Sequence, residues 1–263
     1  MVAHLYKLEC LTNLHVGSGE ANYNIIDKEV ERDPITGYPI IHASGIKGAL
    51  REYFTENKVL PEAKITEIFG KPSSATEFGA GSYKFFDAHL LSRPMRVGGN
   101  TTRSSISVTS DDLLRDFLTQ TANFGINKYT NVNLPELTFG ENIDFLTNAG
   151  NITVEDEQTD TFDANDADDA DYMEAAKNIV GDTFAVAKNF GSYALPVVAH
   201  NKLEHGESKN LWYEEYVPHG SVFWFLVLTP DEKNELNLEN QTMLQFGANA
   251  SIGYGFVRIT KLA

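Results

Sequence analysis

The sequence has little of several features that would each direct it to a particular class of protein. It contains one cysteine, Cys10, so no internal disulfide can form, and a cytoplasmic protein is the simplest interpretation. No run of about 18 apolar residues is present, which argues against a membrane-spanning helix. The N-terminal residues interleave apolar and polar side chains and lack the charged-then-apolar pattern of a signal peptide.

Basic residues are also scarce. The chain has 21 Lys and Arg against 37 Asp and Glu, a net charge of −16, which argues against nucleic acid because phosphate contacts need cations. The distribution weakens that objection: segment 141–174 holds twelve acids and no Lys or Arg, and removing those twelve charges from −16 leaves −4. The first hundred residues carry eleven of the basic residues. A locally basic face on an acidic protein is therefore compatible with the sequence.

Apolar periodicity predicts several elements. Strands are expected at His4–Leu14, Leu211–Val217 and Val222–Leu228, and the continuous apolar run of the last one predicts a central strand. Helices are expected after Ser44, with apolar residues at 46, 49, 50, 53 and 54, at Ser110–Leu118 with Ser110 or Asp111 as cap, and at Tyr172–Val180. The chain ends with a glycine-rich loop and a strand.

This order of elements predicts an α+β fold with a ferredoxin-like or RNA-recognition-motif-like core and large insertions. We expect one domain over 1–263, with 141–174 as an acidic, mobile insertion and 194–210 as a hairpin. The acidic tract also has the Asp and Asn density of a calcium loop, but it lacks the glycine and glutamate spacing of the helix–loop–helix type. A solvated surface or a docking site for a basic neighbour is the alternative.

Two glycine-containing stretches are candidate phosphate sites. Ser44, Gly45 and Gly48 surround the start of the first helix, where free backbone amides favour anions, and Lys47 and Arg51 share its polar side. The plain alternative is a surface helix that packs closely on a sheet. In the C-terminal loop, Gly253, Tyr254 and Gly255 would let RNA approach the main chain and a base stack; an ordinary loop is equally compatible.

At these two places the sequence resembles the RAMP superfamily, the RNA-binding proteins of CRISPR systems. The residues that carry the resemblance are LHVGSG, then an aspartate, then ERDPITGYPIIHASGIKGALRE, and the terminal FGANASIGYGFVRI. Three further stretches resemble the backbone subunits of Cmr, the type III-B effector complexes: FFDAHLLSRPMR, VTSDDLLRDFL and NLWYEEYVP. The backbone subunits of Csm complexes share only the first and last motifs, so the Cmr group is favoured.

The resemblance implies roles for individual residues. Asp27 matches the position of the aspartate with which the family cuts target RNA, and His15 is the candidate for target contact or proton movement. Glu214 and Tyr216 match accessory positions. Taken alone, Asp27 would be an ordinary loop carboxylate, His15 a structural histidine, and Glu214 and Tyr216 part of a strand with one wet face.

The resemblance also implies an endoribonuclease that works inside an assembly. Its partners would be guide RNA, target RNA, further copies of itself stacked head to tail and other Cmr subunits. A thumb-like hairpin from each copy would splay the guide–target duplex, and His200, Asn201 and Lys202 lie near the start of the candidate thumb. Cutting in the family depends on a divalent metal, and one carboxylate predicts a loosely held Mg²⁺ that keeps most of its waters.

Two departures from the family pattern and two alternatives stand beside this interpretation. His42-Ala43-Ser44-Gly45 replaces the usual Pro-Gly-Ser-Ser, and Glu29 replaces a common proline. The alternatives are a non-catalytic guide-binding subunit, against which Asp27 argues, and a nuclease that trims the guide precursor, which usually needs a histidine-led site. No nucleotide-binding fingerprint or nucleophile triad indicates a stand-alone metabolic enzyme.

Overall fold

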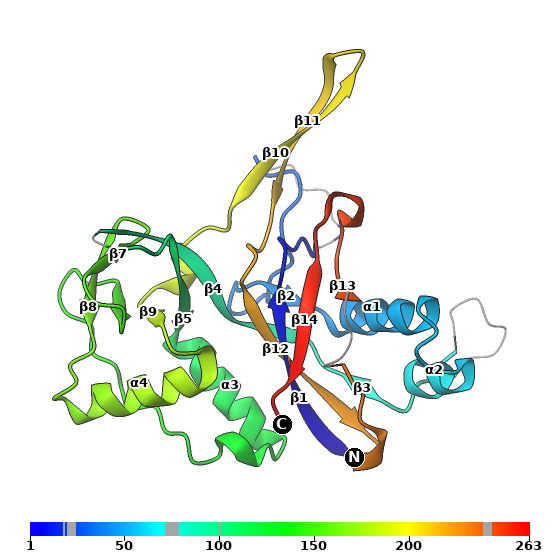
Figure 1. Cartoon of the computed structure of the whole chain (residues 1–263), viewed down its shortest axis with the longest axis horizontal. Helices are drawn as coiled ribbons and strands as arrows, with labels where there is room; N and C mark the ends of the chain where they lie inside the picture. The colour runs from blue at the N-terminus through cyan, green and yellow to red at the C-terminus, as the bar shows by residue number, and fades with distance from the viewer. Residues whose placement is uncertain (18, 20–24, 72–78, 100, 239–243) are drawn as a thin grey trace. The chain divides into compact units, whose positions relative to one another are not determined.

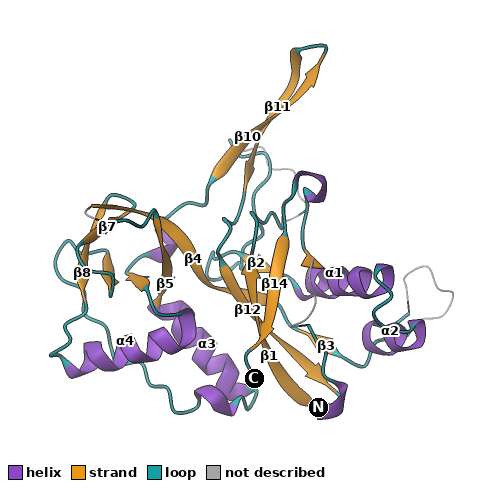
Figure 2. Cartoon of the chain, viewed as in Figure 1, coloured by secondary structure: helices purple, strands orange, loops and turns teal. Residues whose placement is uncertain are grey.

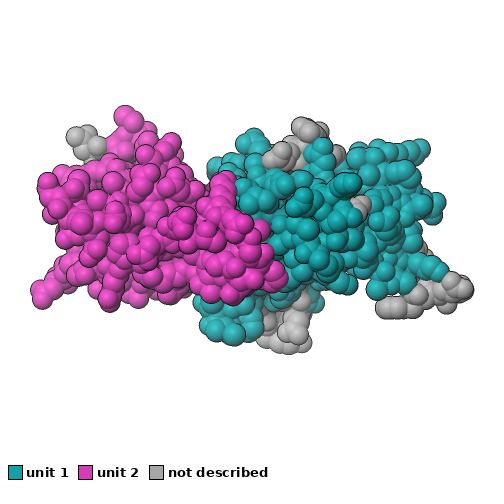
Figure 3. Space-filling model, turned by 90° about the horizontal axis from the view of Figure 1, so that it is seen from below, with its two compact units in different colours: residues 1–89, 195–219, 223–263 teal, residues 90–194, 220–222 magenta. Residues whose placement is uncertain are grey.

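The computed structural model describes residues 1–17, 19, 25–71, 79–99, 101–238 and 244–263. Ser18 of the predicted glycine loop lies outside this set. The chain forms a mixed α and β fold and separates into two compact units, coloured apart in Figure 3: unit 1 is Met1–His89, Leu195–His219 and Phe223–Ala263, and unit 2 is Leu90–Ala194 with Gly220–Val222. Residues 90–194 pack mainly on themselves, around their own buried side chains, and the single domain over 1–263 stays a prediction.

Unit 1 contains the first and last strands of the chain together with helices from its N-terminal part (Figure 1). Its elements are β1 (Val2–Cys10), β2 (Ile40–Ile41), α1 (Ala43–Glu56), α2 (Glu62–Phe69), β3 (Lys84–Phe85), β10 (Val197–Glu204), β11 (Glu207–Glu215), β12 (Val222–Thr229), a 3-10 turn η3 (Glu232–Asn234), β13 (Leu244–Gln245), η4 (Ala250–Ile252) and β14 (Phe256–Lys261). The first residue of β12, Val222, is assigned to unit 2.

The sheet of unit 1 has the neighbour order β13–β14–β1–β12, and β3 also pairs with β12. β1 and β14 are antiparallel, with Leu8 opposite Ile259. The prediction that 222–228 forms a central strand is confirmed, since its side chains are almost all buried and it has a neighbour on each side. Tyr6 of β1 stacks on Phe225 of β12 at 5.4 Å between ring centroids, and both side chains are fully buried, so they belong to the core of unit 1.

Helix α1 buries Ile46, Leu50 and Phe54, which the spacing predicted. The predicted cap was wrong: the N-cap position is His42, whose side chain makes no capping hydrogen bond, and Ser44 lies inside the first turn. The physical reason is tertiary. The carboxylate of Asp87 accepts a hydrogen bond from the backbone N–H of Ala43 at 2.6 Å, so a distant side chain replaces the local cap.

Strands β10 and β11 form an antiparallel hairpin that extends beyond the other strands of unit 1 (Figures 1 and 2). Its register pairs Val197 with Glu215 and His200 with Trp212, and most of its side chains are exposed. The hairpin therefore runs from 197 to 215, so the predicted range 194–210 includes its first strand and turn but only part of the second strand.

Unit 2 is also a mixture of strands and helices. Its elements are β4 (Ala88–Gly99), β5 (Ser105–Ser110), α3 (Asp111–Asn123), η1 (Asn127–Tyr129), β6 (Phe145–Thr147), β7 (Ile152–Val154), β8 (Glu157–Thr161), α4 (Ala167–Val180), β9 (Phe184–Ala187) and η2 (Phe190–Ser192). The first two residues of β4, Ala88 and His89, are assigned to unit 1. β5 pairs with β9 in parallel, and β4 pairs with β5 and with β7 in antiparallel orientation. Ser110 caps α3 as predicted, accepting a hydrogen bond from the N–H of Leu113.

The acidic segment 141–174 forms β6, β7, β8 and the first half of α4. Helix α4 begins at Ala167, five residues before the predicted start, because the Asp166 side chain accepts hydrogen bonds from the N–H groups of Asp168 and Asp169. Acidic side chains in a first helical turn are favoured by the helix dipole. The acids therefore start a helix here; the mobility of the segment stays a prediction. Among the described residues, no helix is long and apolar enough to cross a membrane.

Candidate functional site at the base of the hairpin

The end of β11, at the base of the hairpin, is where several candidate residues meet. The segment around Asp27 runs alongside it: the N–H of Asp27 donates to the carbonyl of Tyr213 at 3.0 Å, and the N–H of Glu215 donates to the carbonyl of Lys28 at 2.9 Å. Lys28 and Glu214 form a parallel bridge. These backbone bonds fix a polar loop against a strand about 186 residues later in the chain.

Asp27 is exposed, and its carboxylate is held in one orientation. Its Oδ2 accepts a hydrogen bond from the N–H of Tyr213 at 2.8 Å, while its own N–H donates to the carbonyl of the same residue. Among the residues that the structure describes, none donates a hydrogen bond to Oδ1. The backbone of β11 therefore holds Asp27 through Oδ2 while the side chain stays exposed.

His15 lies beneath this surface, with an exposed fraction of 4%. Its Nδ1 is 2.7 Å from the carbonyl oxygen of Glu215, and because a carbonyl can only accept, Nδ1 carries the proton. The carbonyl of His15 in turn accepts from the N–H of Ala248 in the C-terminal glycine loop. His15 thus joins β11 to that loop, and its burial suits holding the site together better than direct contact with RNA.

Glu214 is the most buried carboxylate of the site, with its side chain 1% exposed. Its Oε1 accepts a hydrogen bond from the side-chain amide of Asn249 and lies 3.7 Å from Nδ1 of His15, and its Oε2 is 3.4 Å from Nζ of Lys28. A buried carboxylate is stable only when it is paired and hydrogen-bonded. Glu214 therefore ties three segments, including the C-terminal loop, to one strand end.

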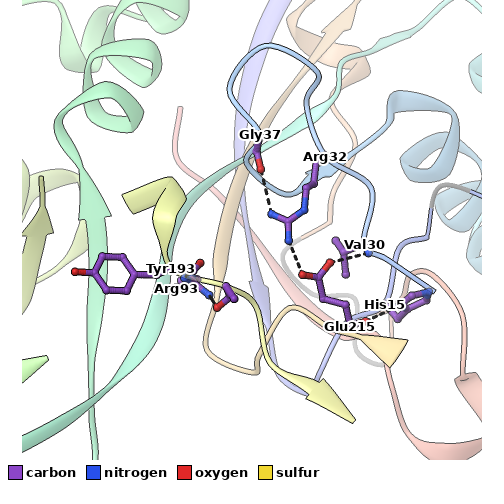
Figure 4. A network of polar contacts seen from close by, with 8 residues as sticks. His15, Val30, Arg32, Gly37, Arg93, Tyr193 and Glu215 are labelled. Carbon is purple, nitrogen blue, oxygen red and sulfur yellow. Dashed lines mark hydrogen bonds and ion pairs between the residues drawn. The ribbon is translucent and has the colours of Figure 1, made fainter. Parts of the chain in front are cut away.

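Glu215 forms a second network, shown in Figure 4. Its side chain is 5% exposed; Oε1 accepts from Nη2 of Arg32 at 2.5 Å, and Oε2 accepts from the N–H of Val30 at 3.0 Å. Nη1 of Arg32 donates to the carbonyl of Gly37 at 3.1 Å. The sequence analysis did not single out Glu215, Arg32 or Asn249. The pair Glu214-Glu215 at the end of a predicted strand was a signal that could have found Glu215. Successive strand residues point to opposite faces of the sheet, so one of two adjacent glutamates is expected to face the interior.

The C-terminal glycine loop approaches His15 closely. Gly247 has a φ of +74°, and a Cβ there would lie 2.3 Å from the carbonyl oxygen of His15; a Cβ at Gly255, with φ +83°, would lie 2.0 Å from the carbonyl oxygen of Phe246. Protein packing thus accounts for these glycines without RNA. Gly253 faces open space, and the ring of Tyr254 is half-buried and packs edge-on against Tyr216 at 6.1 Å.

The predicted residues at the start of α1 line a different part of unit 1 from the end of β11. Ser44 and Lys47 line a cavity of about 250 Å³ together with Lys84. Gly45 and Gly48 are exposed nearby on the same helix. Arg51 instead donates from Nη2 to the carbonyl of Gly70 at 3.1 Å, which gives it a structural partner, and the Asp87 carboxylate already occupies one of the helix N-terminal amides.

The three predicted thumb residues lie on the hairpin and differ in their surroundings. His200 stacks on Trp212 at 5.3 Å, and among the described residues neither His200 Nε2 nor Trp212 Nε1 has a hydrogen-bond partner, although both atoms are buried. The side-chain oxygen of Asn201 accepts from Ser208, and Lys202 pairs with Glu204 at 2.9 Å. Lys202 is exposed and therefore accessible to RNA.

Within the described part of the chain, no three His, Cys, Asp or Glu side chains are grouped so that they could hold a metal ion. The residues that the structure describes therefore form no dedicated protein cage for a divalent cation, and Asp27 contributes one exposed carboxylate.

Comparison with known proteins supplies the family context. The family model described as the RAMP superfamily matches residues 7–258, a range that runs through both units. A curated protein of Pyrococcus furiosus, named CRISPR system Cmr endoribonuclease Cmr4, is 28% identical over 292 residues, covering 99% of this chain and 96% of its own. A protein of Saccharolobus solfataricus, named CRISPR system CMR subunit Cmr4, is 23% identical and covers 97% and 94%.

Solved structures share the fold over the whole chain. One subunit of a type III-B Cmr-β complex bound to cognate target RNA matches with a TM-score of 0.76, at 20% identity, covering 99% of this chain and 97% of that one. Oligomeric Cmr4 from Pyrococcus furiosus matches with a TM-score of 0.71 at 23% identity, covering 100% and 99%. The resemblance to the Cmr backbone group that the motifs indicated is thereby confirmed along the full length.

Proposed function

The chain belongs to the RAMP superfamily, and from that premise we propose that it is a backbone subunit of a type III-B CRISPR complex that binds guide RNA and cleaves complementary target RNA. Full-length similarity to a protein named as a Cmr endoribonuclease supports the assignment. The observation that carries the catalytic part is Asp27: an exposed carboxylate at the base of a projecting hairpin, held on β11 through Oδ2, with no described residue donating to Oδ1.

The assembly that we propose stacks copies of this subunit head to tail along guide RNA, together with other Cmr subunits, in the cytoplasm. The β10–β11 hairpin serves as the thumb that splays the duplex, because both of its strands expose their side chains and it has large exposed apolar residues, among them Leu203 and Leu211. Lys202 and the cavity beside Lys47 are the candidate phosphate contacts. Guide binding then relies on a few cations and backbone amides within an acidic protein.

The reaction that fits this site is internal transfer at a splayed target nucleotide. The 2′-oxygen attacks the adjacent phosphorus, the bond from phosphorus to the 5′-oxygen breaks, and the products are a 2′,3′-cyclic phosphate and a 5′-hydroxyl. Asp27 accepts a hydrogen bond from the attacking 2′-hydroxyl through Oδ1 and orients it in line, so its main contribution is positioning. The hydroxyl proton passes to solvent, and the 5′-oxygen takes one up.

A divalent cation, if the reaction requires one, has no dedicated protein site among the described residues. We propose that Mg²⁺ is held mainly by its own waters and by RNA phosphates, with Asp27 as the nearest protein carboxylate, which is the manner in which this ion usually binds to nucleic-acid enzymes. No step of the reaction above is assigned to it.

The finer fold assignment is also a proposal. In unit 1 the order β14–β1–β12, continued by the first residues of β4, corresponds to strands four, one, three and two of a ferredoxin-like βαββαβ unit, with α1 as the first crossover helix. The stacking of His89 at the start of β4 on Trp224 of β12, at 5.2 Å, supports this neighbourhood. The helix that would connect β12 to β14 has no counterpart among the described residues.

The test is cleavage by the reconstituted complex. Labelled target RNA and Mg²⁺ are added to complexes with wild-type subunit, Asp27→Ala, Asp27→Asn and the control Asp182→Ala, and guide and target binding are measured for each. Asn keeps an acceptor for the Tyr213 N–H and removes only the charge, whereas Ala removes both; Asp182 is 90% exposed and belongs to unit 2. We expect regular cuts from wild type and the control, and none from either Asp27 variant.

Two results would change the proposal. Equal cutting by wild type and Asp27→Ala would remove Asp27 from the mechanism. Absence of cutting by all four complexes, with guide and target still bound, would replace the catalytic subunit by a purely structural one.

A further inference from the structure

Lys28 directly follows Asp27, and its backbone is fixed by the same strand. Its N–H donates to the carbonyl of Tyr213 at 3.2 Å, and its carbonyl accepts from the N–H of Glu215 at 2.9 Å. The Lys28 main chain therefore cannot move independently of the Asp27 carboxylate. Any group that Asp27 orients lies within a few ångströms of a fixed lysine backbone.

The lysine side chain is placed but not fully engaged. Its Nζ is 3.4 Å from Oε2 of Glu214, longer than the roughly 2.7–2.9 Å of a close charge-assisted hydrogen bond. The same atom lies 5.6 Å from the centre of the Trp212 ring, which shields its methylene stem and attracts its charge. The side chain is 52% exposed, so its ammonium group can reach a ligand without unfolding anything.

The neighbouring cation shows the contrast. Arg32 is closed in by Glu215 at 2.5 Å and by the carbonyl of Gly37 at 3.1 Å, so its charge is committed to the protein. The carboxylates of Glu214, on this strand end, and of Asp27, in the loop beside it, repel RNA. A phosphate that enters here needs a compensating cation, and Lys28 lies beside Asp27 with contacts that are long enough to exchange.

We propose that Lys28 is a further catalytic residue: its ammonium group contacts a non-bridging oxygen of the scissile phosphate and stabilises the negative charge that builds up there. As the 2′-oxygen bonds to phosphorus and the bond to the 5′-oxygen breaks, charge grows on the non-bridging oxygens, and a fixed cation stabilises that stage most. Lys28 keeps its proton throughout. Glu214 holds the ammonium before RNA arrives. The inference rests on the proposed function.

The experiment measures single-turnover cleavage in the reconstituted complex. The variants are Lys28→Met, which keeps the stem and removes the charge, and Lys28→Arg, which keeps the charge; the matched control is Lys177→Ala, a partly exposed lysine of α4 in unit 2. Guide and target affinities are measured for each complex. Each complex also cuts targets in which one or the other non-bridging oxygen of the scissile phosphate is replaced by sulfur.

We expect Lys28→Met to cut roughly 100-fold more slowly, the lower end of the 100- to 1,000-fold loss seen when one stabilising donor is removed, with guide and target affinities within twofold of wild type. Arginine should restore most of the rate. The sulfur substitution that slows wild type should lose its effect in Lys28→Met, which a merely structural role would not produce.

A Lys28→Met rate within twofold of wild type would overturn the inference, and so would a loss of rate that only follows lost guide or target binding. An unchanged sulfur effect in Lys28→Met would also overturn it, because the lysine would then not touch the phosphate. These outcomes leave the proposed function standing as long as wild type cuts and Asp27→Ala does not; failure of wild type to cut refutes both.

Discussion

Replacing Glu215 by alanine should destabilise unit 1 by about 2–4 kcal/mol. The carboxylate accepts from the buried N–H of Val30 and from Arg32, and both donors lose their partner. An orphaned buried N–H costs roughly 1–3 kcal/mol. Because the Arg32 side chain is 37% exposed, water replaces part of its lost contact, and we assign that pair about 1 kcal/mol.

Tryptophan fluorescence is the suitable assay, since the two tryptophans of the chain, Trp212 and Trp224, both belong to unit 1. Urea unfolding of wild type, Glu215→Ala, Arg32→Ala and the double variant gives a double-mutant cycle. Glu215→Gln is the matched intermediate, because its amide oxygen can still accept from the Val30 N–H while the charge is gone. We expect it to lose about 1 kcal/mol.

The Arg32–Glu215 pair and the Val30 hydrogen bond should contribute separately to the free energy of unfolding. Arg32 and Glu215 should show an interaction free energy near 1 kcal/mol, while the Val30 contribution remains in the Arg32→Ala background. A loss below about 0.5 kcal/mol for Glu215→Ala, or strict additivity of the two single variants, would contradict the structure of this network.

Three further predictions concern a buried histidine, a closely packed glycine and a helix cap. Burial lowers the pKa of His4, so the unfolded chain binds a proton that the folded chain does not. The contribution of His4 to stability should be complete above about pH 6.5 and should fall as the pH drops toward the lowered pKa. Urea titrations at several pH values should show a smaller fall in the free energy of unfolding for a His4→Asn variant. Gly255→Ala places a Cβ on a backbone carbonyl and should cost more than about 2 kcal/mol, whereas Gly206→Ala, in open space at a similar φ, should cost about 1 kcal/mol; equal thermal shifts would argue against the close approach. Ser110→Ala should lose about 1 kcal/mol of helix capping and Ser44→Ala almost none, which denaturant midpoints of the two variants can distinguish.

Local signals in the sequence were sufficient for much of the fold. The apolar spacing at 46, 50 and 54 predicted the buried face of α1, the run at 222–228 predicted an interior strand, and Ser110 was recognised as a cap, because each depends on residues within one or two turns of chain. Where a distant residue decides, local rules failed: Asp87 took over the cap of α1.

The candidate site divides in the same way. The sequence supplied Asp27, His15 and Glu214 only through the motifs of a family, and no spacing along the chain indicated that they would meet. Two side-chain partners in the site were not predicted: Arg32, which donates to Glu215, and Asn249, which donates to Glu214. Ordinary polar residues of this kind acquire a role only from the groups that folding places opposite them.

The sequence by itself thus determined the family, the chemical groups available and the periodicity of each element, since these are properties of composition and of neighbours along the chain. The tertiary structure alone decided that β11 is the common support of the site. Asp27 and Lys28 are separated from Tyr213 and Glu215 by more than 180 residues, and only folding closes that distance into backbone hydrogen bonds. Burial, which distinguishes the exposed carboxylate of Asp27 from the buried one of Glu214, exists only after that closure.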